Sequence, residues 1–341
     1  FGEVIWSQFA GNTQINNRYY SGNGDKNEFT TFAKATYKVN DQWSVYADLQ
    51  GRFVSYRTSG ITSDVVPLVE SETYNFFNPK AGASYAINEG NQLYFSYGRA
   101  SREPRRSDFE QGVFTPEKLD DLELGWRFAS EKISVNTNAY YMDYTNQLVL
   151  TGAIDDVGAP IRATSGKSYR LGLEIDAQIT ISDKLSLSPN VAISDHKNKD
   201  FVTSKDGALV NLGNTNISFS PSIIAGNSIS YRPTPSLQLA FLSKYVGEQY
   251  MGNIDSEVSK LDAYFTNDLS INYTLHKVPF AKEVVLSGLV NNLFNVEYVS
   301  NGYFFTYDDD FSNPPAITTI EGAGFYPQAK INFLVGATII F

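Results

Sequence analysis

The chain has 341 residues, and its 37 acidic against 27 basic residues give a formal net charge of −10. This acidic balance excludes the basic stripe that nucleic-acid binding requires. Cysteine is absent, which excludes disulfides and thiolate metal sites. No apolar run reaches the roughly 18 residues of a membrane-spanning helix. If the protein crosses a membrane, it must therefore do so as a closed β-barrel, because only that fold leaves no backbone group unsatisfied in lipid.

Alternation of polar and apolar residues predicts about fourteen strands along the chain. The clearest runs from Leu171 to Ile181, where apolar residues alternate with Gly, Glu, Asp, Gln and Thr. The last, from Lys330 to Phe341, has one wholly apolar face and ends on an aromatic residue, which suits a strand that closes a barrel. The fourteen lie near residues 2–10, 29–39, 43–57, 73–87, 91–100, 118–129, 132–149, 165–181, 184–195, 214–231, 236–249, 262–275, 283–298 and 326–341.

The connections between these strands alternate between short turns and long polar loops. Short turns are expected at 40–41, 88–90, 130–131, 182–183, 232–235 and 276–282. Long loops are expected at 11–28, 58–72, 101–117, 150–164, 196–213, 250–261 and 299–325. A soluble β-sandwich has no reason to place every long loop at one end. The pattern is typical of an all-β, up-and-down antiparallel transmembrane β-barrel with periplasmic turns and extracellular loops.

Aromatic residues make up 14% of the chain and gather near the ends of the expected strands. Tyrosine and phenylalanine in such places form girdles at the two membrane interfaces. We therefore expect contacts with outer-membrane lipid and lipopolysaccharide. If the carboxy terminus is periplasmic, every long connection lies outside, and the even strand count places both termini on the periplasmic side. The aromatic residues in question are Tyr19, Tyr20, Tyr74, Phe76, Phe77, Tyr140, Tyr141, Tyr144, Tyr245, Tyr250 and Tyr298.

Seven phrases spread along the chain resemble TonB-dependent outer-membrane receptors, particularly those of Bacteroidetes-type bacteria. The family's fold is a barrel of about 22 strands closed by an amino-terminal plug domain. The resemblance implies that residues 1–341 are one barrel segment, the carboxy-terminal part, with the plug and first strands outside this chain. The phrases are FGEVIW (1–6), FNPKAGASY (77–85), SREPRRSD (101–108), PEKLDDLELG (116–125), KYVGEQY (244–250), LDAYFTNDL (261–269) and NNLFNVEY (291–298).

The resemblance implies active import of a scarce metal chelate or cofactor: a ferric siderophore, cobalamin or haem. The TonB complex would supply energy through the plug, a surface lipoprotein could cover the loops, and the barrel would carry no cofactor of its own. The chain has only two histidines and lacks an intact Phe-Arg-Ala-Pro box at SREPRRSDF, which disfavours haem. The alternative is a self-contained fourteen-stranded passive channel, since an even strand count would allow closure.

Two loops carry candidate ligand-binding residues. Tyr303, Phe305 and Tyr307 lie in the longest loop and could stack on a flat chelate or a corrin. The adjoining Asp308, Asp309 and Asp310 offer hard oxygen ligands for Ca²⁺, unless the whole segment is an ordinary solvated loop. On another loop lie three basic residues, Arg102, Arg105 and Arg106. Their guanidinium groups could bind ligand carboxylates or lipopolysaccharide phosphates, or pair with Asp108 or Glu110.

Catalysis is not expected. His196 follows Asp195, but the serines that could complete a hydrolase set, Ser194 and Ser204, fall at a strand end and in a loop. A hydrolase needs its nucleophile, base and orienting acid to converge in space. Polar residues on the lumen face of the strands are instead expected to meet the plug, namely Glu174, Asp176, Lys244 and Asp268.

Overall fold

The computed structural model describes residues 2–6, 14–62, 66–154 and 160–341, without the side chains of 150–154, 160–162 and Lys277. One antiparallel sheet dominates it, and fourteen of its strands follow one another as hydrogen-bonded neighbours. In order these are β1 (Gly2–Glu3), β2 (Arg18–Lys38), β3 (Trp43–Ile61), β4 (Pro67–Asn88), β5 (Asn91–Arg102), β6 (Glu117–Ala129), β7 (Ile133–Thr145), β10 (Lys167–Ser182), β11 (Leu185–Lys199), β15 (Ile223–Thr234), β16 (Leu237–Val246), β19 (Tyr264–Val278), β20 (Ala281–Asn291) and β23 (Asn332–Ile340).

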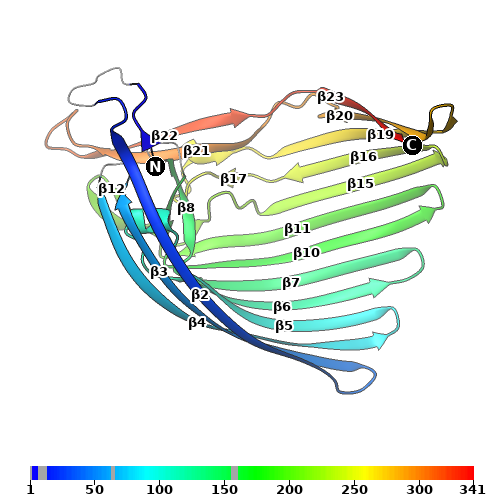
Figure 1. Cartoon of the computed structure of the whole chain (residues 1–341), viewed down its shortest axis with the longest axis horizontal. Helices are drawn as coiled ribbons and strands as arrows, with labels where there is room; N and C mark the ends of the chain where they lie inside the picture. The colour runs from blue at the N-terminus through cyan, green and yellow to red at the C-terminus, as the bar shows by residue number, and fades with distance from the viewer. Residues whose placement is uncertain (1, 7–13, 63–65, 155–159) are drawn as a thin grey trace.

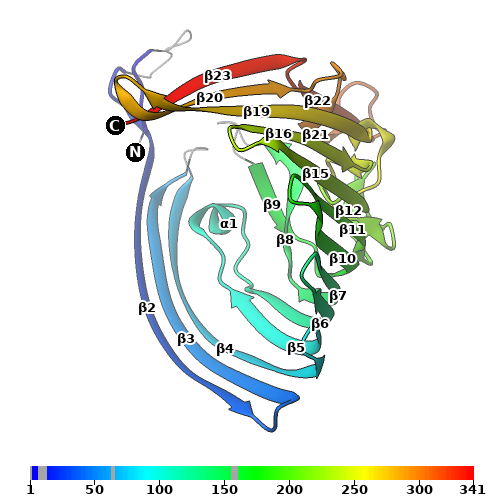
Figure 2. The same ribbon diagram turned by 90° about the vertical axis from the view of Figure 1, so that its right-hand side faces the viewer.

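The sheet curves into a trough whose strands are joined by tight turns at one end and long connections at the other (Figures 1 and 2). We call these the turn end and the loop end. The connections β5–β6, β7–β10, β11–β15, β16–β19 and β20–β23 carry structure of their own. These elements are α1 (Arg106–Glu110), β8 (Leu148–Ile154), β9 (Pro160–Thr164), β12 (Val202–Lys205), β13 (Ala208–Asn211), β14 (Thr215–Asn216), β17 (Gln249–Tyr250), η1 (Glu257–Ser259), β18 (Lys260–Leu261), β21 (Val299–Asp309) and β22 (Thr318–Pro327).

Thirteen of the fourteen expected strands are present as long strands, and short turns alternate with longer connections. The loop expected at 58–72 is wrong in extent, because β3 continues to Ile61 and β4 begins at Pro67. The first expected strand, 2–10, is wrong as far as it is described. β1 has two residues, and Val4 instead exchanges backbone hydrogen bonds with Asn16 and Asn17. β1 pairs with Arg18 and Tyr20 where β2 begins, which places it at the loop end and not the turn end. Residues 7–13 of that expected strand lie outside the described ones.

Several boundaries also differ from the alternation pattern. β2 begins at Arg18, within the loop expected at 11–28, and β23 begins only at Asn332. The loop expected at 299–325 is mostly the β21–β22 hairpin. Beyond a bilayer, strand pairing no longer needs an apolar face, so the hydrophobic pattern disappears where the hydrogen-bonded ladder continues.

The two faces of the sheet differ in chemistry. On β10, Leu171 is 49% exposed and Leu173 41% exposed on the convex outer face. The intervening Gly172 and Glu174 point to the concave inner face, because successive side chains of a strand alternate. From Leu171 to Ile179 the apolar stripe runs for roughly 27 Å along the strand, enough for the band that a transmembrane β-strand presents to lipid.

Aromatic residues flank this outer apolar band at both ends. Near the turn end, Trp43 and Tyr85 are register partners whose rings lie 4.7 Å apart. Near the loop end, the rings of Tyr141 and Tyr169 stack at 6.2 Å. Outward aromatics are thus present near both ends of the band. However, five of the aromatics assigned to the girdles point inward by strand parity, namely Tyr20, Tyr74, Phe76, Tyr140 and Tyr144.

One loop-end connection folds back onto the inner wall. α1 lies inside the concavity of the sheet (Figure 2). Its Phe109, 2% exposed, packs in one apolar cluster with Val54 of β3 and with Tyr74 and Phe76 of β4, and the ring of Tyr56 stacks on it at 5.4 Å. This cluster explains why Tyr74 and Phe76 face inward. No helix in the described ranges is long and apolar enough to cross a membrane.

The described strands form an open sheet. At one edge β2 pairs with β3 along its length and with β1 only at Arg18 and Tyr20. At the other edge β23 pairs with β20 alone. Every residue of β23 is exposed, including Leu334 on the inner face at 62% and Val335 on the outer face at 81%. Such apolar edges require further strands or lipid to cover them.

The Phe109 cluster predicts how firmly the α1 connection is held. Replacing Phe109 with alanine in the full-length protein removes a buried ring, and such changes typically cost about 3 kcal/mol or more, which is roughly a 100-fold shift in the opening equilibrium. We expect trypsin to cleave after Arg105 faster by that factor, because cleavage follows the open population. The control is Phe77→Ala, at a side chain 60% exposed on the outer wall, and equal cleavage rates in both variants would contradict the prediction.

Candidate functional site

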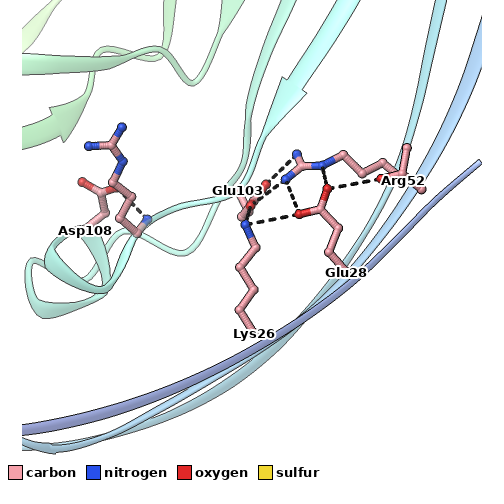
Figure 3. Close-up of polar contacts among 7 residues, drawn as sticks. Lys26, Glu28, Arg52, Glu103 and Asp108 are labelled. Atoms are coloured by element: carbon pink, nitrogen blue, oxygen red, sulfur yellow. Dashed lines mark hydrogen bonds and ion pairs between the residues drawn. The ribbon is translucent and has the colours of Figure 1, made fainter.

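A four-residue ionic network fastens the α1 connection to the sheet (Figure 3). Glu103, which follows β5, is 8% exposed. Arg52 of β3 donates to both of its carboxylate oxygens, at 2.8 and 2.9 Å, and Lys26 of β2 donates to it at 2.5 Å. Arg52 also reaches Glu28 of β2 at 2.6 and 3.0 Å. One guanidinium group thus bridges two carboxylates, and side chains 51 and 77 residues away in sequence hold the start of the connection.

The protonation of Glu103 follows from this geometry. Burial by itself would raise the pKa of the Glu103 carboxyl, but hydrogen bonds from Arg52 and Lys26 hold that pKa below its ordinary value. The carboxylate therefore stays charged at neutral pH and keeps both cations in place. Because a buried charge is costly when a partner is removed, the network fixes the position of the α1 connection more than it adds to overall stability.

The structure separates the three arginines that the sequence grouped together. Arg102 pairs with Glu117 at 3.3 Å across β5 and β6. Arg106 pairs with Glu110 at 2.9 Å, one turn along α1, and donates to Thr58 Oγ1 at 2.5 Å. Both arginines are therefore held by groups of the protein itself. For Arg106 this is the expected pairing with Glu110.

Arg105 differs from its two neighbours. Its side chain is exposed, and no ion pair or hydrogen bond of its guanidinium is recorded with any described residue. Its backbone N–H donates at 2.8 Å to the carboxylate of Asp108, and this hydrogen bond caps the start of α1. The Asp108 carboxylate was expected to pair with an arginine side chain, but it binds this backbone group instead. Arg105 is thus the one cation of the three that is available to a ligand above the inner wall.

The aromatic candidates form one continuous stripe on the β21–β22 hairpin. Tyr303, Phe305 and Tyr307 share one face of β21. The ring centroids of Tyr303 and Phe305 are 6.3 Å apart, and those of Phe305 and Tyr307 are 6.4 Å apart. Glycines on β22 lie opposite two of them, Gly324 beside Tyr303 and Gly322 beside Phe305. A Cβ atom at either glycine would come within 2.5 Å of the facing ring, so the rings lie flat over the partner strand.

The opposite face of the hairpin anchors it. Phe304, 2% exposed, packs with Met251 and Leu261 in a second buried cluster. Period-two alternation on β21 therefore buries Phe304 and leaves Phe305 and Tyr307 38% and 49% exposed. The result is a rigid apolar stripe of π-faces, the kind of surface on which a planar chelate can stack.

Two of the three aspartates that follow this stripe accept hydrogen bonds from nearby protein groups. Asp308 accepts from Thr319 Oγ1 at 2.6 Å and from Ser204 Oγ at 3.0 Å, and these two bonds lower the pKa of its carboxyl. Asp309 accepts from the backbone of Ser312 at 3.0 Å. Within the described residues no group of three His, Cys, Asp or Glu could hold a metal ion. The Ca²⁺ site at Asp308–Asp310 stays a prediction without geometric support.

The structure brings the arginines and the aromatic stripe to the same end of the sheet, but on separate connections. No recorded hydrogen bond, ion pair or ring contact joins the two groups in the part of the chain that is described. A ligand that touches both would have to bridge from α1 to the β21–β22 hairpin. Sequence reasoning missed Lys26, Glu28, Arg52 and Glu103, because their contacts join distant segments and leave no local signal.

The inner wall carries the polar residues expected there. Glu174, Arg170 and His196 line a depression of about 390 Å³, and Lys244 lines another of about 490 Å³ together with Asp268. Asp176 accepts from Asn136 at 2.9 Å. The wall is thus lined by charged and hydrogen-bonding side chains, which suits contact with water or with another polar protein surface.

The residues considered for hydrolysis do not assemble into one set. Ser194 and His196 both line the inner depression, and Ser194 donates to the backbone oxygen of Pro221 at 3.5 Å. Asp195 lies on the outer face, where it accepts from Tyr169 at 2.7 Å, because neighbours on a strand face opposite ways. Ser204 donates to Asp308 and not to His196. The arrangement lacks the nucleophile, base and acid of a catalytic triad at this position.

An open antiparallel sheet with an apolar outer face, a polar inner face and folded loops at one end defines part of a transmembrane up-and-down β-barrel, as expected. Residues 3–293 match the family described as TonB dependent receptor-like, beta-barrel, and the chain belongs to that family. The Bacteroidetes-type resemblance is not tested by this match and stays a prediction.

The chain is similar to proteins that are much longer than itself. It is 24% identical over 268 residues to a ferrioxamine receptor of Yersinia enterocolitica, covering 78% of this chain and 36% of the receptor. Among solved structures, the ferric-catecholate import receptor Fiu of E. coli K12 matches with a TM-score of 0.68 at 16% identity, over 96% of this chain and 47% of Fiu.

Two further solved structures have the same fold. The siderophore receptor PiuA of Acinetobacter baumannii matches with a TM-score of 0.67 at 15% identity, over 93% of this chain and 44% of PiuA. The copper transporter OprC gives the same TM-score and identity, over 93% of this chain and 48% of OprC. The chain thus spans less than half the length of these proteins.

The lowered pKa of Glu103 predicts a pH dependence. Its contribution to docking of the α1 connection is fully present above the ordinary glutamate pKa of about 4.3 and is lost as the pH falls below that value through the lowered pKa. In Glu103→Gln we expect weaker docking at neutral pH and a smaller further loss on acidification.

Hydrogen–deuterium exchange of residues 104–114, corrected for the intrinsic pH dependence of exchange, measures this docking. Glu131→Gln, in the turn between β6 and β7, is the control and should behave like the unchanged protein. An identical pH profile for the Glu103→Gln variant and the unchanged protein would contradict the assigned role.

Proposed function

We propose that this chain forms part of the barrel wall of a receptor that actively imports an anionic metal chelate across the bacterial outer membrane. The first candidate for this chelate is a ferric siderophore. The proposal rests on two features at the same end of a TonB-dependent receptor barrel. One is an arginine without an ion-pair partner among the described residues, and the other is an exposed aromatic stripe. Arg105 can bind carboxylate, catecholate or hydroxamate oxygens, and the rings of Tyr303, Phe305 and Tyr307 can stack on a planar chelate.

The position of the two histidines favours a siderophore over haem. The chain contains two histidines in all. His196 faces the inner depression, and His276 lies near the turn end on β19, where its Nδ1 is 3.2 Å from Glu283. His196 is therefore on the inner wall and not on the connections that carry Arg105 or the aromatic stripe, so neither group has an imidazole on its own connection for the iron of haem. Cobalamin stays a second candidate, because a corrin could also stack on the aromatic stripe.

Energy coupling would pass through segments outside this chain. The exposed edges β2 and β23 are positions where further strands would complete a barrel of about 22 strands. A plug domain inside it would meet the inner wall at Glu174 and Lys244 and would connect to the TonB complex. The loop end would then be extracellular and the turn end periplasmic. A surface lipoprotein over the loops stays a prediction.

The self-contained passive channel is less well supported. It requires β23 to pair with the first strands, but among the described residues the two edges of the sheet are not paired with each other. Its expectation of both termini at the periplasmic side also fails for β1, which lies at the loop end. The described strands therefore favour a piece of a larger barrel.

An uptake experiment separates active import from passive flow. Cells that express the full-length receptor under iron limitation are given radiolabelled ferric hydroxamate and ferric catecholate siderophores. We expect saturable accumulation that stops when a protonophore dissipates the inner-membrane proton gradient. Accumulation that continues unchanged after the protonophore, or in cells without TonB, would contradict active import and support a channel.

The role of Arg105 has its own test. Loss of one charge-assisted hydrogen bond typically weakens binding by about 10-fold to 100-fold. We expect Arg105→Gln in the full-length receptor to weaken binding of an anionic ferric siderophore by that factor, measured by titration on whole cells. Arg232→Gln, an exposed arginine at the turn end, is the matched control. Equal affinity of the two variants would remove Arg105 from the site.

A further inference from the structure

The outer wall of β5, β6, β7, β10 and β11 changes chemistry in steps toward the loop end. The steps follow rows of register partners, each running across the five strands. The first row is wholly apolar, and it consists of Phe95, Leu124, Ala139, Leu173 and Ile193. The second adds tyrosine and one acid, and it consists of Tyr97, Leu122, Tyr141, Leu171 and Asp195.

The next two rows are polar. The third row mixes charges of both signs, and it consists of Arg99, Asp120, Asp143, Tyr169 and Lys197. The fourth is the last outward row before the loop-end connections, and it consists of Ser101, Lys118, Thr145, Lys167 and Lys199. We call this fourth set the lysine row. It contains three cations and no acid, in a chain whose net charge is −10.

The charges of the third row are largely paired with one another. Arg99 and Asp120 form a salt bridge at 2.8 Å, and Tyr97 donates to the same aspartate at 2.6 Å. Tyr169 donates to Asp195 at 2.7 Å. Asp120 and Asp195 thus accept hydrogen bonds from residues below the lysine row, whereas Asp143 pairs with Lys199 of that row.

Two lysines of the fourth row are different. Lys118 and Lys167 are exposed, and no ion pair or hydrogen bond of their ammonium groups is recorded with any residue that the structure describes. Lys199 is held at 3.2 Å by Asp143 and lies 5.2 Å from the ring of Tyr169. Lys118 and Lys167 stand two strand spacings apart, roughly 10 Å, with Thr145 between them.

We propose that the lysine row binds the phosphate groups of an outer-leaflet lipid, such as lipopolysaccharide. The row lies just beyond the tyrosines that mark the membrane interface, where lipid headgroups are found. Lysine is a point-charge phosphate binder, and the hydroxyl of Thr145 can donate to the same group. Two unpaired cations about 10 Å apart suit a headgroup with more than one phosphate.

The same geometry argues against a lipid role for the arginines of the α1 connection. α1 lies inside the concavity, whereas the lysine row is on the convex face. Arg106 is held by Glu110 and Thr58, and Arg105 stands over the inner wall. Lipid phosphates outside the barrel therefore meet lysines on the outer wall, and the imported ligand meets arginine inside. This inference requires the outer face to lie in lipid, but it does not depend on which ligand is imported.

The test uses the full-length receptor with Lys118→Gln and Lys167→Gln combined. Binding is measured as retention by vesicles of phosphatidylcholine with and without lipopolysaccharide, and as lipopolysaccharide that stays bound through purification in mild detergent. Each lysine near an anionic membrane surface contributes about fivefold to binding, so we expect the double variant to bind lipopolysaccharide roughly 25-fold more weakly. Lys118→Arg with Lys167→Arg should retain binding.

The matched control makes the same charge change on the inner wall with Lys34→Gln and Lys80→Gln, for which no ion pair is recorded among described residues. Heat-modifiable migration on gels shows that each variant has folded. Equal lipopolysaccharide binding by the two double variants would overturn the proposal, as would equal retention on vesicles with and without lipopolysaccharide. Displacement of the bound lipid by inorganic phosphate at low concentration would also overturn it, because the row would then be a free-phosphate site.

Discussion

Backbone hydrogen bonding in lipid is the constraint on which the rest of this structure depends. Within a bilayer every N–H and C=O must be paired inside the protein, so the crossing segments are strands joined edge to edge. Pairing in turn forces side chains to alternate between lipid and the inner wall, as on β10. At the loop end the constraint is relaxed, and there the chain can form a short helix and independent hairpins.

The relaxed end is also where long-range contacts decide position. α1 is too short to be stable alone, and it stays in place because Phe109 packs on the inner wall and Glu103 is held by Arg52 and Lys26. The β21–β22 hairpin depends in the same way on Phe304. Both anchors leave other residues of the same segment free, Arg105 in one case and Phe305 in the other. On β21 anchoring and exposure both follow from strand alternation, whereas Arg105 is left exposed at the residue where the helix begins.

The sequence predicted what depends on near neighbours along the chain. Alternation located thirteen long strands, and polar breaks located the turns, because both are set by local chemistry. It failed for residues 2–6, where strand-like composition gives only a two-residue strand, β1. The sequence also could not show which of Arg102, Arg105 and Arg106 are paired. Arg102 pairs with Glu117 on the neighbouring strand, and Arg106 donates to Thr58, which is 48 residues away.

Register is what keeps the proposed ligand site and the proposed lipid site apart. Glu117 and Lys118 are adjacent in β6, yet the first pairs with Arg102 on the inner face and the second stands on the outer wall. A shift of one residue in the pairing of β6 would turn Lys118 toward the lumen and Glu117 toward lipid phosphates. The apolar side chains of Leu122 and Leu124 oppose that shift, since it would move both from lipid to the polar inner wall. The apolar residues that face lipid therefore also fix the register of β6, and the register decides which charged side chains point to the inner wall and which to the outer wall.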